Sequence, residues 1–153
     1  MHITDFLNPA AVEANLKASN KQGVLRELVG AILRVKPELD PNILVDTLQQ
    51  REKLQSTGIG DGIAIPHCKL EDLDDIVACV GRSVEGVDFK SLDGAPSHLF
   101  FMLLVPASSH GLHLKALARV SRLCKDADIR EALLSAEDAE AMYAIIARED
   151  EQL

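Results

Sequence analysis

Apolar residues in the first third of the chain recur three and four positions apart, which is the spacing of amphipathic helices. This pattern predicts one helix from residue 19 or 20 to about residue 35. A second helix is predicted at 41–51, where a proline occupies the first turn. Residues 1–18 form a leading segment, in which Asn8-Pro9 marks a further helix start. At least two helices are therefore expected before the middle of the chain.

The pattern changes after the second helix. Gly58, Gly60 and Gly62 stand within five positions, which is too costly for a stable helix. Asp61-Gly62, between two isoleucines, predicts the turn of a β-hairpin. The apolar run at 63–65 that follows predicts a short buried strand.

Two further apolar runs predict strands. The run at 76–81 is one candidate, and the run from Leu99 to Val105 is the strongest in the chain. The second run shows no alternation of apolar and polar side chains, so both faces of that strand should be covered. Pro106 ends it, because proline lacks the N–H that would continue the pairing. Leu99–Val105 is therefore expected to be a central strand of a sheet.

The last third of the chain predicts three more helices, at 111–125, 128–134 and 135–147. The last of them begins at a Ser-Ala-Glu-Asp sequence that offers an N-terminal capping arrangement. Two helices, then strands, then three helices indicate a mixed α/β fold with the sheet sandwiched between helices. The length of 153 residues fits one domain over 1–153. The charged tail at 148–151 is expected to be a solvated helix end.

Composition narrows the classes of partner. The formal net charge of −8 argues against a nucleic-acid backbone as the main ligand. Aromatic residues make up only 3% of the chain, so stacking platforms for bases or sugars are not expected. The three cysteines have no paired motif spacing, which is typical of free thiols in a reducing compartment. The sequence shows neither a secretory signal nor a membrane span, and it predicts a cytoplasmic protein.

His67 is the first candidate for chemistry. It follows the predicted strand 63–65 and Pro66, where a buried strand reaches the edge of a sheet. The Gly-rich turn before it has little side-chain bulk, and its N–H groups should be open to an anion, as in phosphate-binding nests. From position alone, a polar residue that ends a strand is the alternative interpretation. Cys68 should point to the opposite side of the strand, which disfavours a Cys/His dyad.

His113 and Arg51 are the other candidates. His113 lies in the first turn of the helix at 111–125, where free N–H groups and the helix dipole favour an anion. Arg51 ends the second helix and leads into the Gly-rich loop, where a guanidinium can pair with a carboxylate or a phosphoryl group. A core histidine and a surface arginine are the alternatives. A metal site at His110 and His113 is disfavoured, because no third ligand has a supporting spacing.

The sequence from Arg51 to His67 resembles the signature of the mannitol/fructose class of enzyme IIA of the phosphotransferase system. That signature has an acid or amide, here Glu52, then an apolar-Gly pair, and finally apolar-Ala-apolar-Pro-His and a small residue. Similarity around His113 and elsewhere extends the resemblance over nearly the whole chain. Within the class, Arg-Glu-Lys-Leu-x-Ser-Thr-Gly-Ile-Gly is most similar to the nitrogen-related regulatory branch. Cys68 departs mildly from that branch, in which glycine is commoner.

The resemblance implies roles for the candidate residues. It implies that His67 is phosphorylated on Nε2, that His113 is a second active-site histidine and that Arg51 is the nearby cation. It further implies a loop that cradles the phosphoryl group, formed by Ser56, Thr57, Gly58, Gly60 and Gly62. No cofactor and no metal is implied.

The resemblance also implies partners. The phosphoryl donor would be an HPr-like phosphocarrier dedicated to the nitrogen branch. Regulatory targets in nitrogen metabolism, potassium transport or stress responses, including sensor kinases, would respond to the phosphorylation state. A homodimer is a further candidate assembly. Two alternatives stay open. One is a sugar-specific (fructose/mannitol) enzyme IIA that passes the phosphoryl group to a IIB domain, and the other is a non-catalytic regulatory binding module.

Overall fold

A six-stranded mixed sheet forms the middle of the computed structural model, which describes residues 1–153. The strands are β1 (Leu7–Glu13), β2 (Gly58–Gly60), β3 (Ile63–Ala64), β4 (His67–Leu70), β5 (Val77–Val87) and β6 (Ser97–Pro106). Their spatial order is β1-β5-β6-β3-β2, and β4 also pairs with β6. β6 is therefore central: it pairs antiparallel with β5 along one edge and parallel with β3 and β4 along the other.

β6 confirms the prediction of a central strand covered on both faces. Every residue from Leu99 to Val105 is buried. Phe100 packs edge to face against Phe89, with the ring centroids 5.3 Å apart. The neighbouring strand β5 extends beyond the predicted end at residue 81, because it keeps pairing with β6 as far as Val87.

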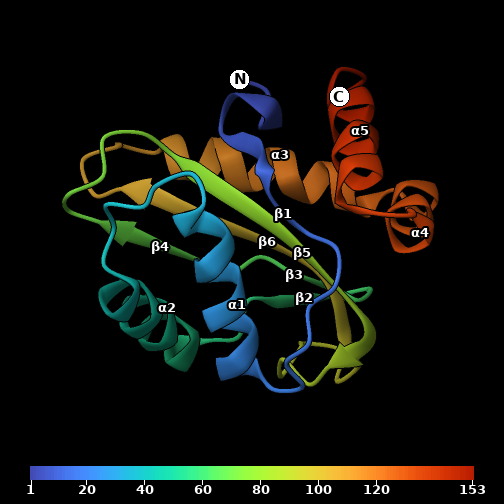
Figure 1. The fold of residues 1–153 in the computed structure, drawn as a ribbon, viewed down its shortest axis with the longest axis horizontal. Coiled ribbons are helices and arrows are strands. Elements are labelled where there is room, and N and C mark those ends of the chain that lie inside the picture. Colours follow the sequence, from blue (N-terminus) through green and yellow to red (C-terminus); the bar gives the residue numbers. More distant parts are fainter.

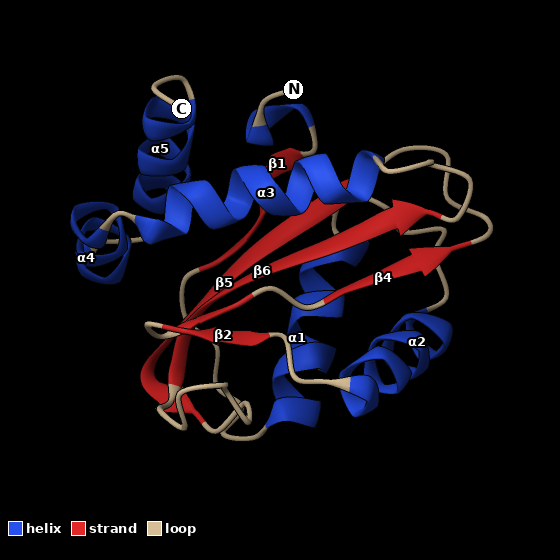
Figure 2. Ribbon diagram, turned by 180° about the vertical axis from the view of Figure 1, so that it is seen from behind, coloured by secondary structure: helices blue, strands red, loops and turns tan.

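Helices cover both faces of the sheet (Figures 1 and 2). α1 (Lys21–Leu33) and α2 (Pro41–Leu54) lie on one face, and α3 (Leu112–Lys125) lies on the other. α4 (Ala127–Ser135) and α5 (Ala139–Asp150) pack together at one end, where α5 contacts β1 and the short 3-10 helix η1 (Ile3–Asp5). None of the helices is long and apolar enough to cross a membrane. The predicted mixed α/β fold with its sheet between helices is confirmed.

Side-chain caps set where the helices begin. Asn20 accepts a hydrogen bond from the first turn of α1 at 2.8 Å, and Asp40 caps α2 in front of its proline. The last two helices differ from the prediction. Asp126 caps α4 one residue earlier than expected, and Asp138, not Ser135, caps α5. Ser135 cannot begin the last helix because α4 continues through it.

The leading segment forms a strand, so the helix start predicted at Asn8-Pro9 is wrong. β1 pairs parallel with β5, and Leu7, Ala11 and Val12 are buried. A proline is tolerated here because β1 is an edge strand, and its register shifts between Leu7 and Val12. The partner strand lies far along the chain, so the local sequence gives little sign of this pairing.

Asp150 corrects the expectation of a solvated tail. Its side chain is fully buried at the end of α5. It accepts hydrogen bonds from Arg119 Nε at 2.9 Å and from the Thr4 backbone N–H at 3.2 Å. Arg119 Nη2 also donates to the backbone carbonyl of Asp150 at 2.6 Å. These bonds connect α3, α5 and η1.

Arg82 is a second buried charge that the sequence did not reveal. Only 4% of the residue is exposed, and no carboxylate pairs with it. Its Nε donates to the Ala14 carbonyl at 3.1 Å, and its Nη1 donates to the carbonyls of Leu133 at 2.9 Å and Ala136 at 2.7 Å. The last carbonyls of a helix lack partners within the helix and carry partial negative charge. Arg82 therefore connects β5 to the residue that follows β1 and to the end of α4.

Candidate functional site

His67 lies at the first position of β4, directly after Pro66, whose carbonyl accepts from the Leu103 N–H of β6 at 2.9 Å. β3 and β4 both run parallel to β6, and Ile65-Pro66 separates them. The ring Nδ1 lies 2.8 Å from the Ile65 carbonyl oxygen. A carbonyl oxygen only accepts, so Nδ1 carries the proton and donates this bond. The lone pair of the neutral ring is therefore on Nε2.

The surroundings of His67 favour its neutral form. Burial lowers the pKa of His67 below the ordinary 6.5, and electrostatic interactions with Arg51 and with His113 act in the same direction. The hydrogen bond to Ile65 and the negative charge of Glu52 oppose this shift without cancelling it. The imidazole is consequently neutral at pH 7, and its Nε2 can act as a nucleophile.

Arg51 and His113 act on His67 from two different helices. Arg51 lies in the last turn of α2, which continues past the predicted end to Leu54, and its Nη1 donates to the Gln55 carbonyl at 3.0 Å. His113 lies in the first turn of α3, and its buried Nδ1 has no hydrogen-bond partner in the protein. Both residues lie near enough to His67 to affect its pKa.

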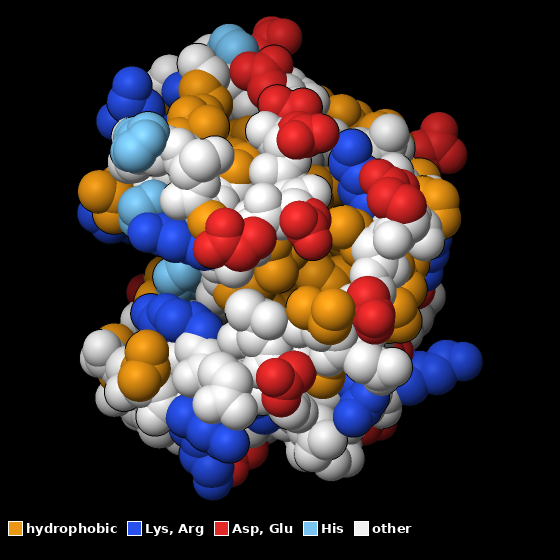
Figure 3. Space-filling view, turned by 90° about the vertical axis from the view of Figure 1, so that its left-hand side faces the viewer, with side chains coloured by type: hydrophobic (Ala, Val, Ile, Leu, Met, Phe, Trp, Pro, Cys, Tyr) orange, Lys and Arg blue, Asp and Glu red, His pale blue; other side chains and the backbone are white.

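The surface on this side of the molecule is hollowed and locally basic. Figure 3 shows histidine side chains beside lysine and arginine side chains along an indentation. The chain as a whole carries a formal net charge of −8, so this cluster stands out against an acidic background. A concave basic surface attracts anions.

The Gly-rich segment forms the hairpin that the sequence predicts, between β2 and β3. Asp61 at φ 57° and Gly62 at φ 76° are both left-handed, as the two-residue turn of type I′ requires. Gly60, at φ 100°, precedes the turn and pairs with Ile63. The two glycines leave the turn with little side-chain bulk.

Three amides of this segment donate to side chains and are not open to an anion, contrary to expectation. The Thr57 N–H donates to Glu52 at 3.1 Å, the Gly58 N–H donates to Ser56 Oγ at 3.1 Å, and the Asp61 N–H donates to Asp93 at 3.2 Å. Ser56 Oγ in turn donates to the Phe89 carbonyl at 2.7 Å. The prediction of free loop amides is therefore wrong for these three N–H groups, which bond within the protein.

Glu52 is the residue of this region whose position the sequence reasoning missed. It is 8% exposed and accepts hydrogen bonds from Lys21 Nζ at 2.9 Å, from the Thr57 N–H and from the Thr57 hydroxyl. A signal for its burial was present in the sequence. Leu44, Leu48 and Glu52 are four positions apart, and this spacing places all three on the buried face of α2.

Cys68 takes no part in the site. It is buried on the face of β4 opposite to His67, and burial raises the pKa of its thiol to about 12. The nucleophilic thiolate is therefore absent near pH 7, and a Cys/His dyad is excluded. No group of three or more His, Cys, Asp or Glu side chains lies close enough together to hold a metal ion.

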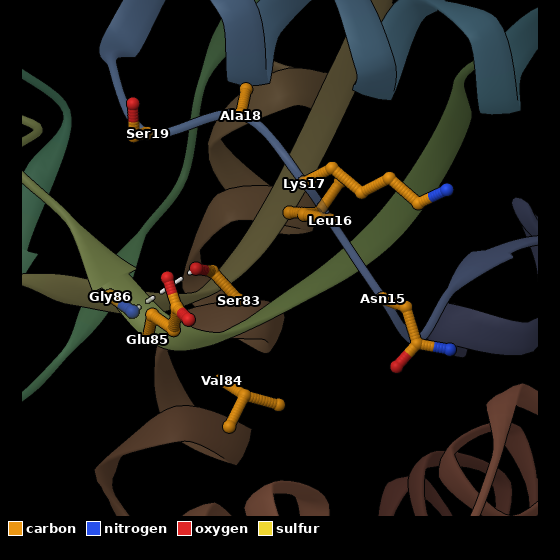
Figure 4. A pocket seen from close by; sticks show the side chains of 9 residues that line it. All are labelled: Asn15, Leu16, Lys17, Ala18, Ser19, Ser83, Val84, Glu85 and Gly86. Carbon is orange, nitrogen blue, oxygen red and sulfur yellow. Dashed lines mark hydrogen bonds between the residues drawn. The ribbon is translucent and has the colours of Figure 1, made fainter.

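A separate hollow lies towards the opposite end of β5. It has a volume of about 360 Å³ and is lined by Asn15–Ser19 and Ser83–Gly86 (Figure 4). Within it, the Gly86 N–H donates to Ser83 Oγ at 3.1 Å. None of the predicted site residues lines this hollow, so the candidate chemistry stays at His67.

We expect His67 to make the folded state less stable as the pH falls. Because its pKa is lowered in the folded protein, the unfolded chain binds a proton more readily at this residue. The contribution of His67 to the free energy of unfolding is fully present above about pH 6.5, and it is lost as the pH decreases from there. Urea unfolding at about pH 7.5 and about pH 5.5 measures the effect. Wild type should lose more unfolding free energy than His67→Gln, and equal losses would contradict the prediction.

Comparisons with known proteins identify the family of this chain. Residues 5–149 match the family model described as "Phosphoenolpyruvate-dependent sugar phosphotransferase system, EIIA 2". The chain is 40% identical over 147 residues to a nitrogen regulatory protein of Bradyrhizobium diazoefficiens, covering 96% of this chain and 95% of that protein. It is 37% identical over 150 residues to the fructose-specific EIIABC component of Bacillus subtilis, covering 98% of this chain and 24% of that larger protein.

A solved structure has the same fold. The crystal structure of nitrogen regulatory protein IIA-Ntr from Neisseria meningitidis matches with a TM-score of 0.87 and 31% identity, covering 94% of this chain and 98% of that one. The family model spans nearly the whole sequence, including every candidate residue. This chain therefore belongs to the EIIA type-2 family of the phosphoenolpyruvate-dependent sugar phosphotransferase system, and it is similar over nearly its full length to nitrogen regulatory members of it.

Proposed function

We propose that this protein is a cytoplasmic phosphohistidine carrier of the nitrogen-related phosphotransferase system, and that Nε2 of His67 accepts the phosphoryl group. The hydrogen bond from His67 Nδ1–H to the Ile65 carbonyl supports this most directly, because it leaves the lone pair on Nε2. The lowered pKa of His67 keeps that lone pair available at pH 7.

The transfer forms one bond and breaks one. Nε2 of His67 attacks the phosphorus of a phosphohistidine on the donor, the donor's P–N bond breaks, and its electron pair returns to the donor imidazole. No proton has to leave His67, because its N–H is on Nδ1. The ring becomes positively charged once Nε2 is bonded to phosphorus. The Ile65 carbonyl oxygen, 2.8 Å from Nδ1, stabilises that charge.

Arg51 and His113 are proposed to stabilise the phosphoryl oxygens. Phosphoryl transfer spreads negative charge over these oxygens, so positioned cations and N–H donors supply most of the catalysis. Both residues interact electrostatically with His67, and the first turn of α3 adds the positive end of a helix dipole.

Replacing His113 with alanine should slow phosphoryl acceptance by about tenfold to a hundredfold. The fold should be retained, because the buried Nδ1 of His113 makes no hydrogen bond that the substitution would break. Rapid-quench kinetics with a phosphorylated donor and a thermal unfolding curve measure the two effects. His110 is exposed, so His110→Ala is the control, and its rate and unfolding curve should match those of wild type. An unchanged rate in His113→Ala would remove this residue from the mechanism.

The donor is proposed to be an HPr-like phosphocarrier of the nitrogen branch. Exposed apolar side chains near the site suit such docking: Leu54 at the end of α2 is 81% exposed, and Leu114, next to His113, is 62% exposed. A phosphoryl group adds about two negative charges at pH 7, which alters what can bind there. Regulators of nitrogen metabolism or stress, potassium transporters and sensor kinases are the proposed targets that respond to this change.

A sugar-specific role is the second candidate. The 37% identity to a fructose-specific EIIABC component is close to the 40% identity to a nitrogen regulatory protein, and it supports this role. In that case a IIB domain would take the phosphoryl group from His67.

Intact mass separates the candidates. The protein is incubated with enzyme I, phosphoenolpyruvate and either the nitrogen-type HPr-like protein or a sugar-type HPr. A single acid-labile phosphoryl adduct formed with the nitrogen-type donor supports the main proposal. An adduct formed only with the sugar-type donor supports the second candidate. No adduct with either donor contradicts both and leaves a non-catalytic binding module.

A further inference from the structure

We propose that Glu52 is a positioning residue that fixes the ring of His67 through a chain of hydrogen bonds. The inference rests on the proposed function, since it concerns how the nucleophile is aimed at the phosphoryl group. The chain runs from Lys21 on α1 through Glu52 on α2 and the start of the Gly-rich loop to the imidazole. Every link in this chain is a hydrogen bond.

The first links involve a buried carboxylate whose two oxygens are both used. Oε1 of Glu52 accepts from Lys21 Nζ at 2.9 Å and from the Thr57 N–H at 3.1 Å, and Oε2 accepts from the Thr57 hydroxyl. Lys21 is itself held, because its Nζ lies 4.5 Å from the centroid of the Phe89 ring. Glu52 therefore connects two helices to the loop, and both of its oxygens are engaged within the protein.

Thr57 and Ile65 carry the constraint on to His67. The Thr57 carbonyl accepts from the Ile65 N–H at 3.0 Å. The Ile65 carbonyl accepts from His67 Nδ1–H at 2.8 Å. Moving Thr57 would consequently move the carbonyl that selects the tautomer of the nucleophile.

This constraint acts on the short segment between β3 and β4. The Pro66 carbonyl accepts from the Leu103 N–H of β6 at 2.9 Å, whereas the Ile65 N–H donates to the Thr57 carbonyl at 3.0 Å. Pro66, which follows, has no N–H to donate. The bond to Thr57 is thus the backbone contact that fixes the Ile65 amide, and Glu52 determines where Thr57 lies.

An electrostatic role for Glu52 fits the site less well. Its negative charge raises the pKa of His67, which opposes the neutral form that attacks phosphorus. A carboxylate would also repel the phosphoryl oxygens. Lys21, at 2.9 Å, offsets this charge. Positioning by hydrogen bonds therefore explains the buried acid, whereas its charge alone does not.

Two substitutions separate the hydrogen bonds of Glu52 from its charge. Glu52→Gln keeps hydrogen-bonding atoms for Thr57 and removes the charge, whereas Glu52→Ala removes both. We expect Glu52→Ala to slow phosphoryl acceptance by about tenfold or more, and Glu52→Gln to stay within about threefold of wild type. Glu131→Ala, which changes an exposed acid on α4, is the control and should match wild type.

The tautomer of His67 gives a second readout. Nitrogen-15 NMR of the ring should show the Nδ1–H form in wild type and in Glu52→Gln, and a mixture of both tautomers in Glu52→Ala. Equal rates in wild type and Glu52→Ala would overturn the proposal. A Glu52→Gln rate as slow as that of Glu52→Ala, or a slow Glu52→Ala with an unchanged tautomer, would overturn it as well.

Two further measurements keep the test decisive. If Glu52→Ala does not fold, Thr57→Val takes its place in the test. Thr57→Val removes only the hydroxyl bond to Glu52, so it should cause a smaller tautomer shift and a smaller loss of rate. An unchanged tautomer in Thr57→Val would count against the proposal. If wild type accepts no phosphoryl group from any donor, the proposed function fails. The NMR comparison still decides whether Glu52 fixes the ring.

Discussion

His67→Gln is expected to abolish phosphoryl acceptance, lowering the rate by more than about a thousandfold, because an amide has no nucleophilic nitrogen to replace Nε2. The substitution should leave the fold intact. Glutamine is similar in size to histidine, and its amide N–H can still donate to the Ile65 carbonyl that now accepts from Nδ1 at 2.8 Å. Intact mass after incubation with the phosphorylated donor, together with a thermal unfolding curve, measures both parts.

His98 offers a matched control within the same chain. It is half-buried like His67, and its Nδ1 also lies within hydrogen-bond distance of a carbonyl oxygen, that of Ser83, at 2.9 Å. His98→Gln therefore removes a comparable imidazole in a comparable setting, and it should accept the phosphoryl group at the wild-type rate. An acid-labile adduct on His67→Gln, or its loss in His98→Gln, would show that the assignment of the nucleophile is wrong.

Arg82→Met should lower the free energy of unfolding by about 3 kcal/mol or more. Methionine has nearly the length of the arginine stem and fills the same space, so the loss comes from polar groups and not from a cavity. The carbonyls of Ala14, Leu133 and Ala136 would lose their donor inside the protein. Buried carbonyls without a partner are costly because water cannot replace the lost bond.

Urea unfolding of three variants tests this assignment. Arg26→Met removes an exposed arginine of α1 and should change the free energy of unfolding by less than about 0.5 kcal/mol. Arg82→Lys keeps the charge but not the planar guanidinium group. Its free energy of unfolding should lie between those of wild type and Arg82→Met. If Arg82→Met were as stable as Arg26→Met, Arg82 would not hold the residue after β1 and the end of α4 together.

The parts of this molecule that the sequence predicted depend on local patterns. Leu99–Val105 is uniformly apolar because helices cover both of its faces, so its place at the centre of the sheet could be predicted. Asp61-Gly62 could be read as a hairpin turn because few other residues adopt two successive left-handed conformations. His67 followed from its place after a short strand and a proline, together with a long signature.

The parts that the sequence did not reveal depend on distant partners. β1 pairs with a strand far along the chain, and Pro9 within it suggested a helix start instead. Arg82 and Asp150 look like surface charges until the groups that bond them are known, and the spacing that indicates the burial of Glu52 does not reveal its partners. Charged residues are rarely buried without such partners, so sequence reasoning places them in solvent by default. The link from Glu52 to the nucleophile could be found only in three dimensions.

The buried Asp150 also implies an order of folding. Its bond to the Thr4 N–H joins residues 146 positions apart. Closing so long a loop costs chain entropy that is recovered only after the sheet has brought the two ends together. During synthesis, η1 and the beginning of β1 leave the ribosome long before α5 does. They therefore remain unpaired with α5 until the whole chain has been made. We therefore expect the two ends of the chain to gain protection from hydrogen exchange last and to lose it first.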